Sequence, residues 1–170
     1  PPTDIYTKTV VGSVRCVYET GLFDEGWDVI RESWHQRQLE LGVIPSGTQL
    51  APRNPGVEKW DNLPQNQKLL AARLQEAFAA FLDHTDDQIG RLVSGLRDAD
   101  ELDNTIFILL SDNGASQEGG PFGVMHEMKF FNGILETPDQ AIQNIDDIGG
   151  PHSHTTVSYT HLTLPTTVFV

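Results

Sequence analysis

The stretch that decides the expected fold is Asn104-Thr-Ile-Phe-Ile-Leu-Leu-Ser-Asp-Asn-Gly-Ala-Ser116. Its apolar run, from Thr105 to Leu110, is short and rich in Ile and Phe, which predicts a buried strand rather than a helix. The Asn113-Gly114 pair predicts a sharp turn directly afterwards, because glycine tolerates positive φ and asparagine nearly does. We therefore expect a core strand that ends at a polar turn.

Two oxygen-bearing side chains, Asp112 and Asn113, stand at that turn. In open α/β sheets, ligands bind beyond the carboxyl ends of the strands. A carboxylate beside a carboxamide suits a hard divalent cation such as calcium or magnesium, which takes oxygen ligands. The same residues also suit an Asx turn that only caps the strand, so the local sequence leaves both interpretations open.

A long helix is predicted from Pro64 to about Leu96, because apolar residues recur there every three or four positions. Gly90 and Gly95 each cost about 1 kcal/mol relative to alanine inside a helix, which suggests close packing or a break near the end. A helix, a short polar turn and a buried strand make half of a βαβ unit. The sequence therefore favours an α/β fold with a central sheet flanked by helices. The predicted apolar face consists of Leu70, Leu74, Ala77, Phe78, Phe81, Thr85, Ile89, Leu92 and Leu96.

Two shorter helices are expected on either side of this unit. Apolar spacing predicts one from Trp27 to Gly42, and a cap at Thr137 predicts a short one that runs to Asn144. Between the first helix and the long helix, residues 43–63 are rich in proline and glycine. We expect an ordered connector there, with Trp60 and Leu63 holding it against the core.

Composition narrows the class of protein. The chain has 170 residues, of which 38% are hydrophobic and 21% charged, as in a soluble globular domain. Its formal net charge of −13, with only 11 basic residues, disfavours nucleic acid as a partner. The sequence has no apolar window long enough to predict a membrane span. Cys16 is the only cysteine, which excludes an intrachain disulfide and a multi-cysteine zinc site.

Other polar residues were candidates for a site. Adjacent residues such as His126 and Glu127 point apart on a helix or strand, which disfavours a ligand pair. His152 and His154 share a face if extended, which suits a metal or an anion, but a surface loop is the simpler interpretation. His84, Asp86 and Asp87 are predicted to lie on a solvated face of the long helix. Lys129 is predicted to be a charge that flanks packed aromatic residues, with substrate contact as the alternative.

Several pieces of the sequence, in order and spacing, resemble the sulfatase family within the alkaline phosphatase-like superfamily. The resemblance covers about residues 21–154 and is greatest to the arylsulfatase-type branch. The pieces that carry it are Gly21-Leu-Phe-Asp-Glu-Gly-Trp-Asp28, Arg37-Gln-Leu-Glu-Leu-Gly-Val-Ile-Pro45, Thr85-Asp-Asp-Gln-Ile-Gly-Arg-Leu92, the stretch Leu102 to Ser116, Glu118-Gly-Gly, and Lys129-Phe-Phe-Asn-Gly.

The resemblance implies a partial alkaline phosphatase-like sandwich, incomplete in this chain, and hydrolysis of sulfate esters of small molecules or glycans. Asp112 and Asn113 match the aspartate and asparagine that ligate calcium in the family. The nucleophile implied is formylglycine, made from the first residue of a Cys/Ser-x-Pro-x-Arg motif, and the metal stabilises charge on the sulfuryl oxygens. Many members are periplasmic or secreted.

Departures from the family are concentrated near the two ends. Cys16 is followed by Val17, Tyr18, Glu19 and Thr20, so Tyr18 and Thr20 stand where the Cys/Ser-x-Pro-x-Arg pattern has proline and arginine. The nucleophile is therefore expected outside this chain, and no catalytic residue is assigned within it. We expect residues 1–20 to be a non-family or misread segment, 21–154 a partial catalytic domain, and 155–170 a Thr-rich tail of foreign sequence. The chain alone is then expected to be inactive and unmodified.

Two alternatives remain open from the sequence. One is a phosphodiesterase or phosphonate hydrolase of the same superfamily, which would share the metal site. The other is a non-catalytic metal-binding or interaction protein.

Overall fold

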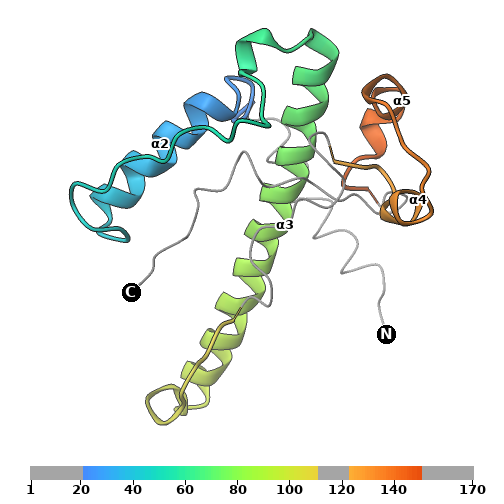
Figure 1. The fold of residues 1–170 in the computed structure, drawn as a ribbon. Coiled ribbons are helices and arrows are strands. Elements are labelled where there is room, and N and C mark those ends of the chain that lie inside the picture. The colour runs from blue at the N-terminus through green and yellow to red at the C-terminus, as the bar shows by residue number, and fades with distance from the viewer. Residues whose placement is uncertain (1–20, 111–122, 151–170) are drawn as a thin grey trace.

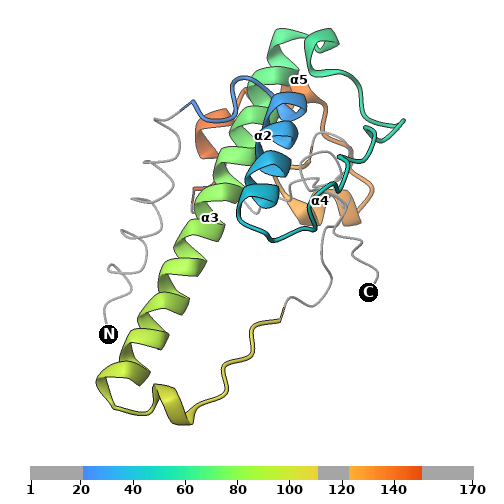
Figure 2. The same cartoon turned by 90° about the vertical axis from the view of Figure 1, so that its left-hand side faces the viewer.

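The computed structural model describes residues 21–110 and 123–150. One long helix, α3, forms the spine; α2, α4 and α5 gather around its first half, whereas η2 lies at the far end, where α3 terminates (Figures 1 and 2). In chain order the elements are α2 (Trp27–Glu40), η1 (Trp60–Asn62), α3 (Gln65–Asp98), η2 (Leu102–Asn104), α4 (Glu127–Phe131), α5 (Pro138–Ile142) and η3 (Ile145–Asp147).

The long helix is confirmed, and it runs without interruption through Gly90 and Gly95. Among the described residues, a side chain built at either glycine would meet no atom within 4 Å. The expected break is therefore wrong, and no described residue packs closely against either glycine. They sit in an open stretch of helix where they only lower its intrinsic stability.

The first half of α3 is buried on two sides. On one side, Ala72 packs with α2 and the connector in a cluster of Phe23, Trp27, Ile30, Trp60 and Leu63. On the other side, a second cluster joins α3 to the segments around α4 and α5, and its members are Leu70, Leu74, Ala77, Met125, Ala141 and Ile148. The core of the described structure is thus formed where α3 lies between two sets of neighbours (Figure 1).

The connector between α2 and α3 is ordered, as predicted, and runs back along α2. Two side chains of α2 donate hydrogen bonds to backbone carbonyls of the connector. Trp27 Nε1 donates to Glu58 O at 3.2 Å, and Arg31 Nη2 donates to Ala51 O at 2.9 Å. These bonds satisfy carbonyl groups that an irregular segment would otherwise leave unpaired. Trp60 is buried in the same region, together with Leu63, and both pack in the first cluster.

Gly26 is required where α2 begins. Its φ is +82°, a left-handed value that glycine adopts at little cost. A Cβ at this position would lie 2.1 Å from Cδ2 of Trp60. The glycine therefore lets the indole of Trp60 pass directly against the backbone.

The short helix near the C-terminal side is also confirmed. Thr137 caps α5, with its Oγ1 accepting a hydrogen bond from Gln140 N while Gln140 Oε1 accepts one from Thr137 N. This reciprocal arrangement is a capping box, and Pro138 occupies the first turn. Asn66 of α3 also donates a hydrogen bond to Asp139 of α5.

The predicted α/β sandwich is wrong for the part of the chain that the structure describes, because it is helical and contains no strand or sheet. Residues 105–110 are extended but are not a strand, and Ile106 is 88% exposed. The physical reason is that a strand needs a neighbouring strand to pair its backbone groups, and no such neighbour exists among the described residues. An apolar, β-branched run fixes an extended backbone but does not supply a partner.

The predicted apolar face of α3 is buried only in its first half. Leu70 is 1% exposed, whereas Phe81 is 59% exposed and Leu92 is also exposed. Beyond Phe81 no buried residue remains on α3. Among the described helices, none has a stretch both long and apolar enough to cross a membrane.

Candidate functional site

The predicted metal ligands, Asp112 and Asn113, lie outside the described residues, as do His152 and His154. The structure does describe the segments that lead to and from this part of the chain. These two segments, residues 98–110 and 123–136, flank the predicted ligands in the sequence.

The approach begins with a tight reversal at the end of α3. Asp100 adopts a φ of +57°, its N–H donates to Arg97 O at 3.0 Å, and Glu101 N donates to Leu96 O at 3.0 Å. This pair of bonds is a Schellman motif, in which glycine usually takes the left-handed position. Thr105 Oγ1 then donates to Glu101 O at 2.7 Å, and the chain continues as the extended segment 106–110.

The segment that follows, residues 123–136, is held in place by the carboxylate of Glu136. Its Oε1 lies 2.6 Å from Lys129 Nζ, and its Oε2 accepts a hydrogen bond of 2.9 Å from Met125 N. The Glu136 side chain is only 11% exposed, so this ion pair is shielded from water on the glutamate side. Met125 packs in the second cluster, and Glu136 therefore ties α4 and the start of α5 to the core.

The charge state of Glu136 follows from these contacts. Burial alone would raise the pKa of this carboxyl. The hydrogen bonds from Lys129 and from Met125 N, together with the positive charges of Lys129 and His126, outweigh burial and hold the pKa below its usual value. Lys129, predicted as a charge flanking two phenylalanines, thus has a defined partner seven residues along the chain.

The polar residues on the second half of α3 do not form a site. Asp86 and Asp87 are exposed, which confirms the prediction of a solvated face. Nδ1 of His84 is buried and has no hydrogen-bond partner among the described residues. In the described ranges, 21–110 and 123–150, no three His, Cys, Asp or Glu side chains come close enough to hold a metal ion.

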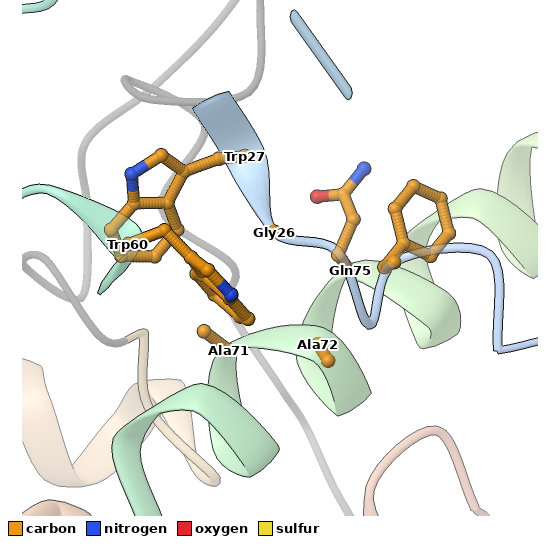
Figure 3. Close-up of a pocket in the computed structure, with 7 residues that line it drawn as sticks. Gly26, Trp27, Trp60, Ala71, Ala72 and Gln75 are labelled. Atoms are coloured by element: carbon orange, nitrogen blue, oxygen red, sulfur yellow. The ribbon is translucent and has the colours of Figure 1, made fainter. Parts of the chain in front are cut away.

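A small pocket that the sequence did not indicate lies between α2, the connector and α3 (Figure 3). Trp27 and Trp60 cross edge to face there, with ring centroids 4.9 Å apart. The room inside is about 10 Å³, at the lower limit for one water molecule and far too small for a sulfate ester or a sugar. Gln75 lines the pocket and is buried, and no described residue forms a hydrogen bond with its Oε1.

Glu76 is a second buried acid, and its pKa shifts in the opposite direction from that of Glu136. Its Oε2 lies 3.6 Å from Arg73 Nη1, and its side chain is almost fully shielded. Burial raises the pKa of Glu76, and the nearby Asp24 adds to that effect, while Arg73 lowers it without compensating fully. Glu76 and Gln75 are both far from residues 111–122 in the sequence. Because both are polar residues, the sequence pattern did not predict that they would be buried.

Comparison with known proteins supplies the family. The sulfatase family model matches residues 32–162. An uncharacterized sulfatase of Schizosaccharomyces pombe (strain 972 / ATCC 24843) is 42% identical over 96 residues, which are 56% of this chain and 17% of that protein. An arylsulfatase of Klebsiella aerogenes is 29% identical over 100 residues, which are 59% of this chain and 21% of that protein.

The chain therefore spans about a fifth of the length of these two relatives. The family match, in contrast, extends over most of the 170 residues. It also includes the stretch Asn104 to Ser116 on which the resemblance chiefly depends. The chain belongs to the sulfatase family.

Proposed function

We propose that this chain is part of a sulfatase that hydrolyses sulfate esters, and that Asp112 and Asn113 are its contribution to a calcium site. The observation that carries the proposal is the family match across residues 32–162, which includes Ser111-Asp112-Asn113-Gly114 directly after an apolar run. The arylsulfatase relative supports the same reaction class.

The two residues fit calcium in kind but not in number. Calcium takes six to eight oxygen ligands in proteins, and a carboxylate and a carboxamide supply hard oxygen donors. Among residues 21–110 and 123–150, no three His, Cys, Asp or Glu side chains come close enough to form a metal site of their own. The remaining ligands would come from residues beyond those described, so we expect the isolated chain to bind calcium weakly.

The nucleophile is proposed to lie outside these 170 residues, since no Cys/Ser-x-Pro-x-Arg motif occurs among them. A formylglycine there would supply the attacking oxygen, and the bound metal would stabilise charge on the sulfuryl group. In this account the chain positions two metal ligands between the segments 98–110 and 123–136. Sulfated small molecules or glycans are the proposed substrates, and the isolated chain is proposed to be inactive.

Calcium titration of the 170-residue chain tests the metal proposal. Terbium luminescence, displaced by calcium, reports binding directly even when the affinity is weak. We expect saturable binding with a dissociation constant on the order of 10⁻⁴–10⁻³ M, as for weak calcium sites with few protein ligands. Asp112→Ala and Asn113→Ala should each abolish saturable binding. Asp86→Ala, which removes an exposed acid on α3, is the matched control and should leave binding unchanged.

Equal binding in all three variants would assign the affinity to the acidic surface in general and contradict the proposal. Hydrolysis is tested separately with 4-nitrophenyl sulfate and with bis(4-nitrophenyl) phosphate. The isolated chain should hydrolyse neither. Turnover of the sulfate ester by the chain alone would place a nucleophile within these 170 residues, and turnover of the phosphate diester would favour the sister hydrolase class.

A further inference from the structure

We propose that Glu136 is an acid-operated latch: its ionised carboxylate holds residues 123–136 on the core, and protonation of that carboxylate opens this segment locally. Only contacts made between described residues carry this inference, which is therefore independent of the proposed enzymatic function.

Both oxygens of the Glu136 carboxylate are bound by groups that can only donate a hydrogen bond. Oε1 lies 2.6 Å from Lys129 Nζ, and Oε2 accepts a hydrogen bond of 2.9 Å from Met125 N. An ammonium group and a backbone N–H offer no acceptor. A protonated carboxyl carries an O–H that needs an acceptor, and it loses its charge attraction to Lys129. Protonation is therefore incompatible with this pair of contacts.

The contact with Met125 links the latch to the core. Met125 is 3% exposed and packs in the second cluster, and the Glu136 side chain is also largely buried. Because little water reaches these groups, solvent does not fully replace a lost bond to Met125 N. A buried N–H without a partner costs free energy. Opening of the segment, which brings water to this N–H, is then the favourable response.

The charges around Glu136 keep the latch closed at neutral pH. Burial would raise the pKa of this carboxyl, but the hydrogen bonds from Lys129 and Met125 N and the positive charges of Lys129 and His126 outweigh it. The pKa therefore lies below its ordinary value of 4.5. A carboxyl with a lowered pKa contributes stability above the ordinary value and loses it as pH falls below that value. The latch is thus expected to open as pH falls below 4.5.

Opening should stay confined to residues 123–136, because α5 and η3 are tied to α3 by other contacts. Asp139, the ionisable residue of α5, accepts a hydrogen bond from Asn66 of α3. Arg73 Nε donates to Ile145 O at 3.4 Å, and Arg73 Nη1 lies 3.6 Å from Glu76. These charged groups of α3 and α5 therefore have partners other than Glu136, and their contacts remain when the latch opens.

Hydrogen–deuterium exchange of the 170-residue chain tests the latch, when it is read as protection factors so that the intrinsic pH dependence of exchange cancels. From about pH 7 to about pH 3.5, protection at residues 124–131 should fall by about tenfold or more. Protection at residues 70–80 of α3 should stay within about twofold over the same range.

Three variants sharpen the test. Glu136→Gln should lower protection at residues 124–131 by about tenfold even at neutral pH, because its amide adds a donor for which neither partner offers an acceptor. Its protection should no longer depend on pH. Glu32→Gln makes the same change at an exposed acid of α2, and this matched control should behave like the wild type. Lys129→Met removes a positive charge beside Glu136, so its segment should open at a higher pH than that of the wild type.

Several results would overturn the proposal. Unchanged protection at residues 124–131 in Glu136→Gln would do so, as would opening of the wild type and Lys129→Met at the same pH. This second comparison decides the question even if Glu136→Gln does not fold. Simultaneous loss of protection at residues 70–80 and 124–131 would show global acid unfolding in place of a local latch. An equal effect of Glu32→Gln would assign the opening to net charge.

Discussion

The two halves of α3 have the same three- and four-residue apolar spacing, yet they differ completely in packing. Leu70 in the first half is fully buried in the second core cluster, whereas Leu92 in the second half is exposed to solvent. Apolar spacing therefore specified the helix in both halves, and burial followed only where neighbouring segments were present. Residues 105–110 show the same dependence on neighbours. Their apolar, β-branched sequence favours an extended backbone, but no described strand pairs with it.

The largest expected effect comes from truncating equivalent leucines in the two halves. Leu70→Ala should lower the free energy of unfolding by about 2–5 kcal/mol, because it removes packed atoms and leaves a cavity. Leu92→Ala should change it by less than about 0.5 kcal/mol, as at most exposed positions. Urea denaturation followed by circular dichroism measures both. Similar losses in the two variants would mean that the second half of α3 is packed too.

Glycines give a second contrast. Gly26→Ala should cost about 2–4 kcal/mol, since the new methyl group would collide with Trp60 and the backbone has positive φ. Gly90→Ala should instead stabilise the protein by about 1 kcal/mol, because no described residue lies within reach of the new methyl group and alanine is the better helix former. The same denaturation experiment measures both changes, and destabilisation by Gly90→Ala would reveal a neighbour that packs there.

The two helix ends allow a finer comparison. Both α2 and α3 end in a Schellman motif, with Gly42 at φ +69° in the first and Asp100 at φ +57° in the second. Asp100→Gly should raise the free energy of unfolding by up to about 1 kcal/mol, because it relieves a left-handed non-glycine residue. Gly42→Asp should lower it by a similar amount. If Asp100→Gly is destabilising, the aspartate side chain must make a stabilising contact of its own.

The smallest expected effects concern the two buried acids, and their signs are opposite. Burial raises the pKa of Glu76, so its favourable contribution is complete below the ordinary value of 4.5 and is lost as pH rises above it. The pKa of Glu136 is lowered despite burial, so its contribution is present above 4.5 and is lost as pH falls below it.

Replacement of each acid by glutamine tests these signs. The stability of the wild type relative to Glu76→Gln should fall as pH rises from 4.5, while its stability relative to Glu136→Gln should fall as pH drops below 4.5. Thermal unfolding measured across this pH range gives both differences. If the stability of each variant differs from that of the wild type by the same amount at every pH, the pKa shifts assigned to Glu76 and Glu136 are wrong.

Local sequence signals predicted most of what is helical in the described structure. The spacing around Leu70 specified α3, and Thr137 with Pro138 specified the start of α5. These features depend on residues a few positions apart. The sandwich could not be obtained in this way, because a strand requires a partner that the sequence of residues 105–110 does not identify.

The surroundings of the candidate site were less predictable than the helices. Glu136 binds Lys129 and Met125 N across the turn between α4 and α5, and neither contact follows from a motif. The same is true of Gln75, a polar residue of the helix interior that turned out to be buried beside two tryptophans. Asp112 and Asn113 were singled out by residue type and family resemblance, and they remain predicted ligands.

Amide hydrogen exchange in dilute solution tests the contrast between the two halves of α3 most directly, because it reads protection residue by residue. We predict slow exchange at residues 70–80, where α3 is packed on two sides, and progressively faster exchange towards Asp98. Residues 106–110 should exchange fastest, because their backbone groups pair with no described residue. Uniform protection along the whole of α3, or strong protection of residues 106–110, would contradict the account.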